Sequence, residues 1–114
     1  MIEEKFLNML LNTISLKSKE IFGSKLIDVK LYGSYARNEY NKDSDIDIAL
    51  LVSISENEYS FFRKIIAQLA GQLSLDYDIT VSIKIFDSDF ILSNMFAVPF
   101  YNNIINQGIS INVQ

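Results

Sequence analysis

The apolar positions along the chain follow two different periods, and each period predicts a type of element. At the start of the chain, apolar side chains recur every three or four residues, as on one face of an amphipathic helix. A second such stripe follows Ser55, which begins the capping-box pattern Ser-x-x-Glu. Further on, Asp87 can cap a short helix and Pro99 suits the first turn of another. The helices predicted in this way span residues 3–22, 55–74, 90–96 and 99–107.

Other runs of the sequence are predicted to be β-strands. Residues 26–32 and 44–53 are mostly apolar, and the second run is expected at the centre of a sheet, buried on both faces. Residues 77–86 alternate between polar and apolar side chains, which is the period of a strand with one polar face. Residues 109–113 are expected to add a short edge strand. The predicted fold class is α/β (α+β), with helices packed on a small mixed β-sheet.

Two aspartates lie at the start of the strand predicted at residues 44–53. Because side chains alternate across a strand, Asp45 and Asp47 point to one face, while Ile46 and Ile48 point to the core. Two neighbouring carboxylates repel each other unless a cation lies between them. Mg²⁺ is usually held by one or two carboxylates together with substrate phosphates, so we expect a magnesium site here.

A glycine and a serine follow the first predicted strand, ten residues before the aspartates. Gly33 lets the backbone approach a ligand closely, and Ser34 is expected at the start of a helix, where free N–H groups attract anions. Arg37 and Lys42 are candidates for binding the charge of a triphosphate, although each is equally compatible with an exposed surface cation. The sequence therefore predicts a phosphate site close to the metal site.

This stretch resembles the signature of the DNA polymerase beta-like nucleotidyltransferases in their minimal, single-domain form. The family usually has a glycine at the position of Asn38; asparagine tolerates a positive φ, so we expect the turn to be preserved. The resemblance implies the polymerase beta-like nucleotidyltransferase fold, with residues 1–114 forming a single minimal nucleotidyltransferase domain. The residues that match the signature in order and spacing are Gly33, Ser34, Ala36, Arg37, Ser44, Asp45 and Asp47.

The resemblance also implies a third metal-binding carboxylate on a neighbouring strand. Asp78 is the candidate, because it shares the polar face of the strand predicted at residues 77–86. Asp76 has the same parity and is the alternative. Asp45, Asp47 and Asp78 would then be the catalytic and metal-binding residues of a two-metal site for in-line transfer, with Gly33, Ser34 and Arg37 holding the phosphates of ATP.

Composition excludes several other kinds of site. The chain has 114 residues, of which 49% are hydrophobic, and a net charge of -4, which argues against a nucleic-acid-binding surface. It contains no cysteine and no histidine, which excludes disulfides, thiolate metal sites and imidazole-based triads. No run of 18 apolar residues indicates a membrane segment, so we expect a cytoplasmic protein.

The resemblance implies a function within a toxin–antitoxin pair. Minimal nucleotidyltransferases act as antitoxins of helical HEPN-type toxins, transferring AMP from ATP to a tyrosine hydroxyl of the partner. We therefore expect an Mg-dependent protein adenylyltransferase that works in a hetero-oligomer. The alternatives are a small-molecule nucleotidyltransferase subunit acting on an aminoglycoside-like acceptor, a non-catalytic module that neutralises a partner by contact, and an acidic cluster that holds a structural cation.

Overall fold

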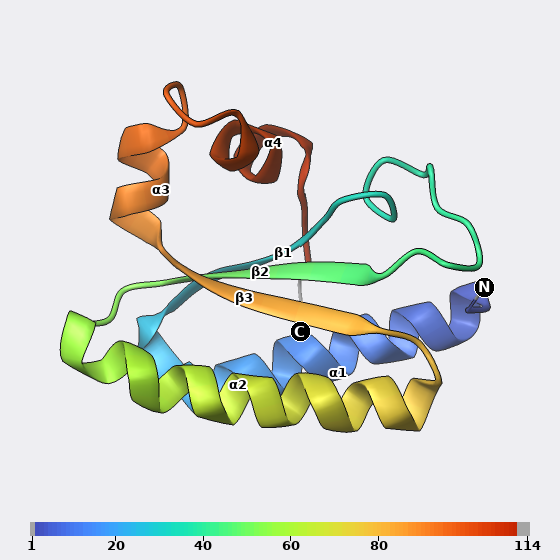
Figure 1. The fold of residues 1–114 in the computed structure, drawn as a ribbon. Helices are drawn as coiled ribbons and strands as arrows, with labels where there is room; N and C mark the ends of the chain where they lie inside the picture. Colours follow the sequence, from blue (N-terminus) through green and yellow to red (C-terminus); the bar gives the residue numbers. More distant parts are fainter. Residues whose placement is uncertain (1, 112–114) are drawn as a thin grey trace.

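The structure is a computed structural model that describes residues 2–111. Helices and strands follow one another in the mixed order that the sequence predicts, with the two long helices before and after the first pair of strands (Figure 1). The elements are α1 (Glu4–Phe22), η1 (Gly23–Lys25), β1 (Leu26–Tyr32), β2 (Ile46–Val52), α2 (Glu56–Tyr77), β3 (Val81–Asp87), α3 (Ser88–Asn94), α4 (Pro99–Gln107) and β4 (Ile109–Ser110).

The four strands form one mixed sheet in the order β3-β2-β1-β4. β1 pairs with β2 and with β4 in antiparallel fashion, and β2 pairs with β3 in parallel. β2 is therefore an interior strand, and every residue from Ile48 to Val52 is buried. This burial confirms the prediction of a central strand buried on both faces. The run could be recognised in the sequence because such a strand needs apolar side chains in both directions.

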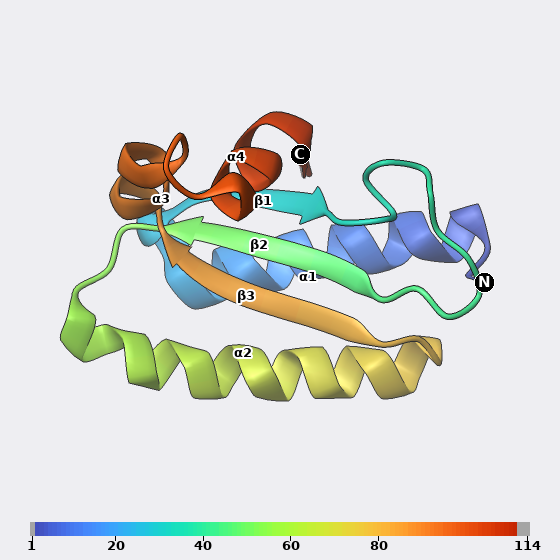
Figure 2. The ribbon, with the colours of Figure 1, turned by 45° about the horizontal axis from the view of Figure 1, so that its top comes forward.

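Helices cover both faces of the sheet. α1 and α2 lie on one face, and α3 and α4 lie on the other (Figures 1 and 2). Ile46, Ile48 and Leu50 of β2 point into the larger core under α1 and α2. Ala49 and Leu51 of the same strand belong to a smaller core with Ile91 of α3 and Ile104 of α4. Asp45 and Asp47 have the parity of Ala49, so they belong to the face that carries α3 and α4.

The junction between α2 and β3 differs from the prediction. α2 continues to Tyr77, and Asp78 ends it as a left-handed C-cap residue with φ 52°. The hydroxyl of Ser74 accepts a hydrogen bond from the Val81 N–H at 2.9 Å, which turns the chain into β3. The prediction that residues 77–80 already belong to the strand is wrong. Tyr77 fits both periods, since it lies four residues after Leu73 on the helical stripe and also shares the strand alternation of Ile79.

Most other predicted boundaries agree with the structure to within two residues. The capping box at Ser55 and Glu58 is present, and Asp87 caps α3 by accepting a hydrogen bond from the Phe90 N–H at 3.0 Å. The predicted edge strand is present as β4, and the remainder of the range 109–113 lies partly outside the described residues. Within residues 2–111, no helix combines the length and apolarity that crossing a bilayer would require.

Candidate active site

The aspartate pair lies where β2 begins, at the C-terminal end of β1. Asp47 pairs in register with Tyr32 of β1 on one side and with Ser82 of β3 on the other. Its side chain is half-buried, whereas Asp45, just before the strand, is exposed. The predicted orientation of the pair is confirmed, since Ile46 and Ile48 between and beyond the acids are fully buried on the opposite face.

Gly33 is fitted closely against Asp47. It directly follows β1 and has φ +75°, a backbone conformation that side chains other than glycine rarely adopt. A Cβ atom built on Gly33 would collide with Oδ2 of Asp47 and lie 3.2 Å from its Cγ. Glycine at this position therefore lets the backbone approach the carboxylate of Asp47, whereas the sequence led us to expect a close approach to a ligand.

The chain from Ser34 to Asn38, which together with Gly33 we call the elbow, forms consecutive turns, and the helix predicted to start at Ser34 is absent. The Arg37 N–H donates to the Gly33 carbonyl at 3.2 Å, and the Glu39 N–H donates to the Ser34 carbonyl at 2.9 Å. Within residues 2–111, the N–H groups of residues 34–36 take no part in backbone hydrogen bonds. These N–H groups remain free to donate hydrogen bonds to an anion. The elbow therefore offers the free donors that we expected from the start of a helix.

Asn38 adopts φ +58°, which confirms that this residue takes the left-handed turn for which the resemblance leads us to expect glycine. Tyr35 anchors the elbow to the larger core. Its ring is buried in that core and stacks on Tyr40, with the ring centroids 4.2 Å apart. An anchored elbow keeps Gly33 against Asp47 without help from a regular helix.

A pocket of about 320 Å³ lies between this elbow, the sheet and α4. Gly33, Arg37 and Asp47 line it, as the sequence suggests, whereas Ser34 does not. Lys42 lines a different pocket and is not among the residues around Gly33. We call this pocket the donor pocket, and the residues that line it are Tyr32, Gly33, Ala36, Arg37, Asp47, Lys84, Phe100, Asn103 and Gln107.

The charges around Asp47 oppose one another. Burial raises the pKa of the Asp47 carboxyl, and the nearby charge of Asp45 raises it further, whereas Lys84 and Arg37 act to lower it. Burial, followed by the charge of Asp47, raises the pKa of Tyr32 to about 12. Tyr32 therefore stays protonated at neutral pH, and the pair of acids is balanced by one cation from the elbow and one from β3.

The structure does not bring a third carboxylate to the pair. Asp78 caps α2 and Asp76 lies in its last turn, where it accepts a hydrogen bond from Gln72 at 2.8 Å. The strand position predicted for Asp78 is wrong, because its left-handed backbone breaks the parity that links it to Ser82, and Asp76, the alternative, lies on the helix. Among residues 2–111, no three acidic, histidine or cysteine side chains are grouped closely enough to hold a metal ion.

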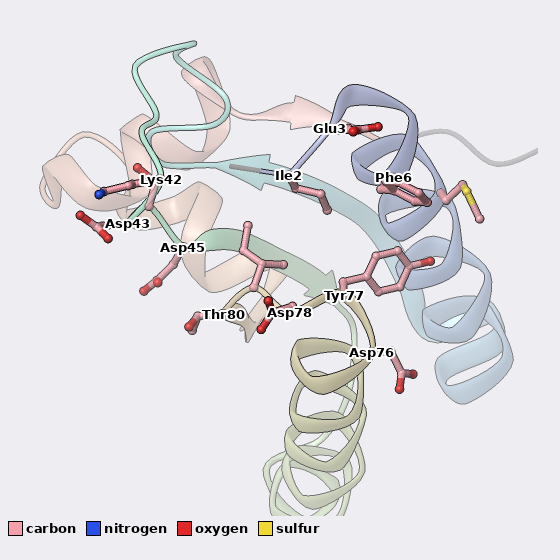
Figure 3. Close-up of a pocket in the computed structure, with 13 residues that line it drawn as sticks. Ile2, Glu3, Phe6, Lys42, Asp43, Asp45, Asp76, Tyr77, Asp78 and Thr80 are labelled. Carbon is pink, nitrogen blue, oxygen red and sulfur yellow. The ribbon is translucent and has the colours of Figure 1, made fainter.

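The residues that do lie beside the pair on β3 follow from the register. Ile46 pairs with Val81 and Asp47 with Ser82, so Asp45 lies next to Thr80, and Lys84 lies opposite Ala49. These three neighbours, Thr80 just before β3 and Ser82 and Lys84 on it, thus carry hydroxyl or ammonium groups. Asp78 and Asp76 instead border a second pocket, which they share with Asp45 (Figure 3).

Comparison with known proteins identifies the family. The sequence model described as "Nucleotidyltransferase domain" matches residues 11–101, which is most of the chain. The chain belongs to the nucleotidyltransferase domain family. The matched region includes residues 33–38, the aspartate pair, β3, α3 and the first residues of α4, so it contains every residue of the donor pocket except Asn103 and Gln107.

Two proteins of Methanocaldococcus jannaschii, both named "Putative protein adenylyltransferase", are similar to this nucleotidyltransferase. MJ0604 is 31% identical over 108 residues, covering 95% of this chain and 96% of the relative. MJ1547 is 45% identical over 58 residues, which are 51% of this chain and 41% of that relative. A solved structure described as a toxin–antitoxin with AMP-PNP has the same fold, with a TM-score of 0.53 and 20% identity over 90% of this chain and 74% of the solved chain.

The residues of this nucleotidyltransferase fit one divalent cation better than two. Asp45 and Asp47 share a face, and the charge of Asp45 raises the pKa of Asp47, so a cation between them would relieve the repulsion. Mg²⁺ is usually held by one or two carboxylates plus substrate phosphates, a requirement that this pair meets. A two-metal arrangement needs further ligands, and Thr80 and Ser82 beside the pair supply hydroxyls in place of a carboxylate.

Sequence reasoning did not assign Lys84, Asn103 and Gln107 to the site. Lys84 carries the parity of Ser82 on β3, and that alternation was visible in the sequence. Phe100, Asn103 and Gln107 have the spacing of one helix face, which was also visible, but their approach to the elbow depends on how α4 packs. In the fold, Lys84 also lies over the Phe100 ring, 5.7 Å from its centroid.

Proposed function

We propose that this chain is an Mg-dependent adenylyltransferase that moves AMP from ATP to a tyrosine hydroxyl of a HEPN-type toxin. The observation that carries this proposal is the fit of Asp47 against Gly33, with Arg37 and Lys84 lining the same pocket as the carboxylate. That combination provides a carboxylate for a cation, free N–H groups for phosphate oxygens, and two positive side chains for a triphosphate.

The reaction assigns each residue a task. The acceptor oxygen attacks the α-phosphorus of ATP, the new oxygen–phosphorus bond forms, and the bond between the α-phosphorus and the bridging oxygen breaks. Pyrophosphate leaves, and the hydroxyl proton passes to solvent or to the exposed carboxylate of Asp45. Asp45 and Asp47 would hold one magnesium ion together with the phosphates, and that ion would supply neutralisation of phosphate charge.

The remaining residues of the donor pocket would bind and orient ATP. The free N–H groups after Gly33 and the side chains of Arg37 and Lys84 suit the β- and γ-phosphates. Arg37 is tied to Glu39 by an ion pair with Nε 3.4 Å from Oε2, which leaves the other guanidinium nitrogens for a ligand. Phe100, Asn103 and Gln107 of α4 close the pocket and are placed to contact the nucleoside.

Two similarities support a protein acceptor. The curated relatives are named as protein adenylyltransferases, and the solved structure with the same fold is described as a toxin–antitoxin with AMP-PNP. The HEPN identity of the partner and the tyrosine acceptor rest on the resemblance of the elbow and aspartate motif to minimal nucleotidyltransferases. The expected assembly is therefore a complex of this chain with a toxin.

The test is the mass of the partner after reaction. The chain, co-purified with its partner, is incubated with ATP and Mg²⁺, and the intact partner is measured by mass spectrometry with fragmentation to locate the modified residue. We expect a gain of one AMP that is lost with Asp45→Asn and with Asp47→Asn. Asp89→Asn is the matched control, because Asp89 is an exposed aspartate in the first turn of α3 and lines none of the pockets described for residues 2–111.

The outcomes separate the competing functions. An unmodified partner that is still inhibited by both aspartate variants would contradict the proposal and indicate a module that neutralises by contact. A partner modified equally by wild type, Asp45→Asn and Asp47→Asn would place the chemistry elsewhere. Transfer of AMP to an aminoglycoside-like molecule, without any gain on protein, would identify a small-molecule enzyme.

A further inference from the structure

A second pocket, of about 990 Å³, borders Asp45 at the end of the sheet where α1 begins and α2 ends. Figure 3 shows Asp45 with Asp43 and Lys42 on the loop, Phe6 on the first turns of α1, and Asp76, Tyr77 and Asp78 at the end of α2. We call it the acidic pocket. The residues that line it are Ile2, Glu3, Phe6, Met9, Lys42, Asp43, Ser44, Asp45, Asp76, Tyr77, Asp78, Ile79 and Thr80.

The lining of this pocket combines negative charge with apolar surface. Five carboxylates and one lysine line it, and within residues 2–111 none of the five carboxylates has a cationic partner within 4 Å. Phe6 and Met9 of α1 are 44% and 48% exposed, although both are large apolar side chains. Unpaired carboxylates beside exposed apolar side chains complement a ligand that carries both positive charge and hydrocarbon.

The two pockets are lined by different members of the aspartate pair and differ in charge. Asp47 lines the donor pocket with Arg37 and Lys84, and Asp45 lines the acidic pocket. In an in-line displacement the attacking and leaving oxygens lie on opposite sides of the phosphorus, so donor and acceptor must approach the pair from different directions. A polyanionic triphosphate is attracted by the cations of the first pocket and repelled by the acids of the second.

We propose that the acidic pocket binds the acceptor, and that this acceptor is a cationic polypeptide segment with lysine or arginine and apolar side chains next to the reactive hydroxyl. This inference rests on the proposed function, because it assigns the substrate side of the same site. The volume lies at the upper end of the range for ligand pockets, about 300–1,000 Å³, and exceeds what a single side chain fills. The apolar wall of Phe6, Met9 and Ile79 favours a peptide over a purely polar polycation.

Peptide binding to the unmodified chain, without ATP, tests the pocket independently of catalysis. Two fluorescent peptides are compared, each with one tyrosine and two leucines, flanked by four lysines in one and four glutamates in the other. The test variant is the double substitution Asp76→Asn and Asp78→Asn. Asparagine accepts the left-handed conformation of Asp78 and keeps an oxygen for the Gln72 amide, so the fold is preserved.

A matched control removes the same charge elsewhere. The double substitution Glu20→Gln and Asp89→Asn changes one exposed acid on α1 and one on α3, neither of which lines a pocket described for residues 2–111. We expect the lysine peptide to bind more tightly than the glutamate peptide, and its affinity to fall about three- to tenfold in the test variant at low salt. The control should retain the wild-type affinity.

Three results would overturn the inference: equal binding of the two peptides, unchanged binding in the test variant, or an equal loss in the control. Failure of the proposed function looks different. If the lysine peptide behaves as expected but no AMP reaches the partner, the pocket is a cation-binding site and the transferase proposal fails. If AMP transfer to the partner proceeds with the same KM in the test variant, the transferase proposal stands and the acceptor enters elsewhere.

Discussion

On one side of Asp47 lies β1, where Gly33 turns away with a positive φ and leaves room for the carboxylate; on the other side lies β3, where Ser82 stands in register with it. The first neighbour is fitted to the acid so closely that a Cβ has no space. The second presents a hydroxyl where a third carboxylate would complete a two-metal site. The donor half of the site is thus built tightly into the fold, and the half that would activate an acceptor is chemically open.

This difference separates the part of the site that the chain supplies from the part that it lacks. The elbow, Asp47 and the cations that lower its pKa all come from one short region and one neighbouring strand, so the residues that would hold the nucleotide under the proposed function all belong to this chain. Among residues 2–111, no third carboxylate is grouped with the pair to act as a general base beside Ser82. Under the proposed function, activation of the acceptor would therefore fall to solvent, to Asp45 or to the partner.

The largest effect on stability is expected from Gly33→Ala, which disrupts the close contact between Gly33 and Asp47 on the β1 side. The new Cβ collides with Oδ2 of Asp47 and forces a non-glycine residue to φ +75°. Overpacking and backbone strain together should cost about 2–4 kcal/mol of unfolding free energy. Chemical denaturation measures this loss, and nucleotide binding should fall with it.

Gly71→Ala is the matched control, because Gly71 lies inside α2 and nothing stands within 4 Å of the position that a Cβ atom would take there. It should stabilise the chain by about 0.5–1 kcal/mol, as expected for replacing glycine within a helix. If Gly33→Ala were as well tolerated as Gly71→Ala, the close fit of Gly33 to Asp47 would be incorrect.

The β1 side of Asp47 was predictable from the sequence, because the residues that form it are near one another along the chain. Gly33 ends one apolar run and Asp45 and Asp47 begin the next, so alternation alone placed both acids on one face. The other side depends on where α2 ends, and the sequence does not mark that point. Tyr77 fits the helical stripe and the strand alternation equally well, and only the left-handed backbone at Asp78 decides between them.

The helical residues of the donor pocket show the same limit. Asn103 and Gln107 were predicted to lie on a helix, and they do. Their place beside the elbow follows from the packing of Ile104 under α4 against Ala49 and Leu51 of β2, a long-range contact that no local pattern specifies. The local turn at Asn38 was predictable, because it depends on the φ preference of one residue.

The next largest effect is expected from Ser82→Asp, which would make the two sides of Asp47 more alike. A third carboxylate beside Asp45 and Asp47 should lower stability without metal by about 1 kcal/mol through repulsion and raise Mg²⁺ affinity about tenfold. Thermal unfolding with and without Mg²⁺ measures both effects. Ser82→Asn has nearly the same shape without the charge and should show neither, and equal behaviour of the two variants would mean that position 82 does not face the pair.

A smaller effect is expected from Asp47→Asn on the metal-free chain. The pKa of Asp47 is raised in the folded state, first by burial and then by Asp45, so the folded chain binds this proton more tightly than the unfolded chain. Stability therefore falls as pH rises from the unfolded pKa, about 3.9, through the folded pKa. The variant should be more stable than wild type at pH 7 by a few tenths of a kcal/mol to about 1 kcal/mol, and the gain should vanish below about pH 4.

Urea unfolding of both proteins across pH 3–8 measures this difference. Asp28→Asn is a useful comparison, because Asp28 is paired with Lys30 and accepts a hydrogen bond from Ser110, so losing its charge should not stabilise the chain. If Asp47→Asn were less stable than wild type at every pH, the attraction of Arg37 and Lys84 for the Asp47 carboxylate would exceed the cost of burying its charge. The metal-free site would then already be neutralised.

The smallest effect is expected from Asn38→Gly, which restores the residue that the family usually has at the outer end of the elbow. Asn38 already occupies the left-handed region with φ +58°, so glycine relieves little strain and adds entropy to the unfolded chain. The unfolding free energy should change by less than about 0.5 kcal/mol, and nucleotide affinity should be unchanged.

Asn38→Val is the contrasting variant, because valine disfavours a positive φ. It should lower the free energy of unfolding by about 1–2 kcal/mol and weaken nucleotide binding, because the elbow positions Arg37. If glycine instead raised nucleotide affinity severalfold, the asparagine would be a defect in the donor side, and the contrast between the two sides of Asp47 would be smaller than the structure indicates.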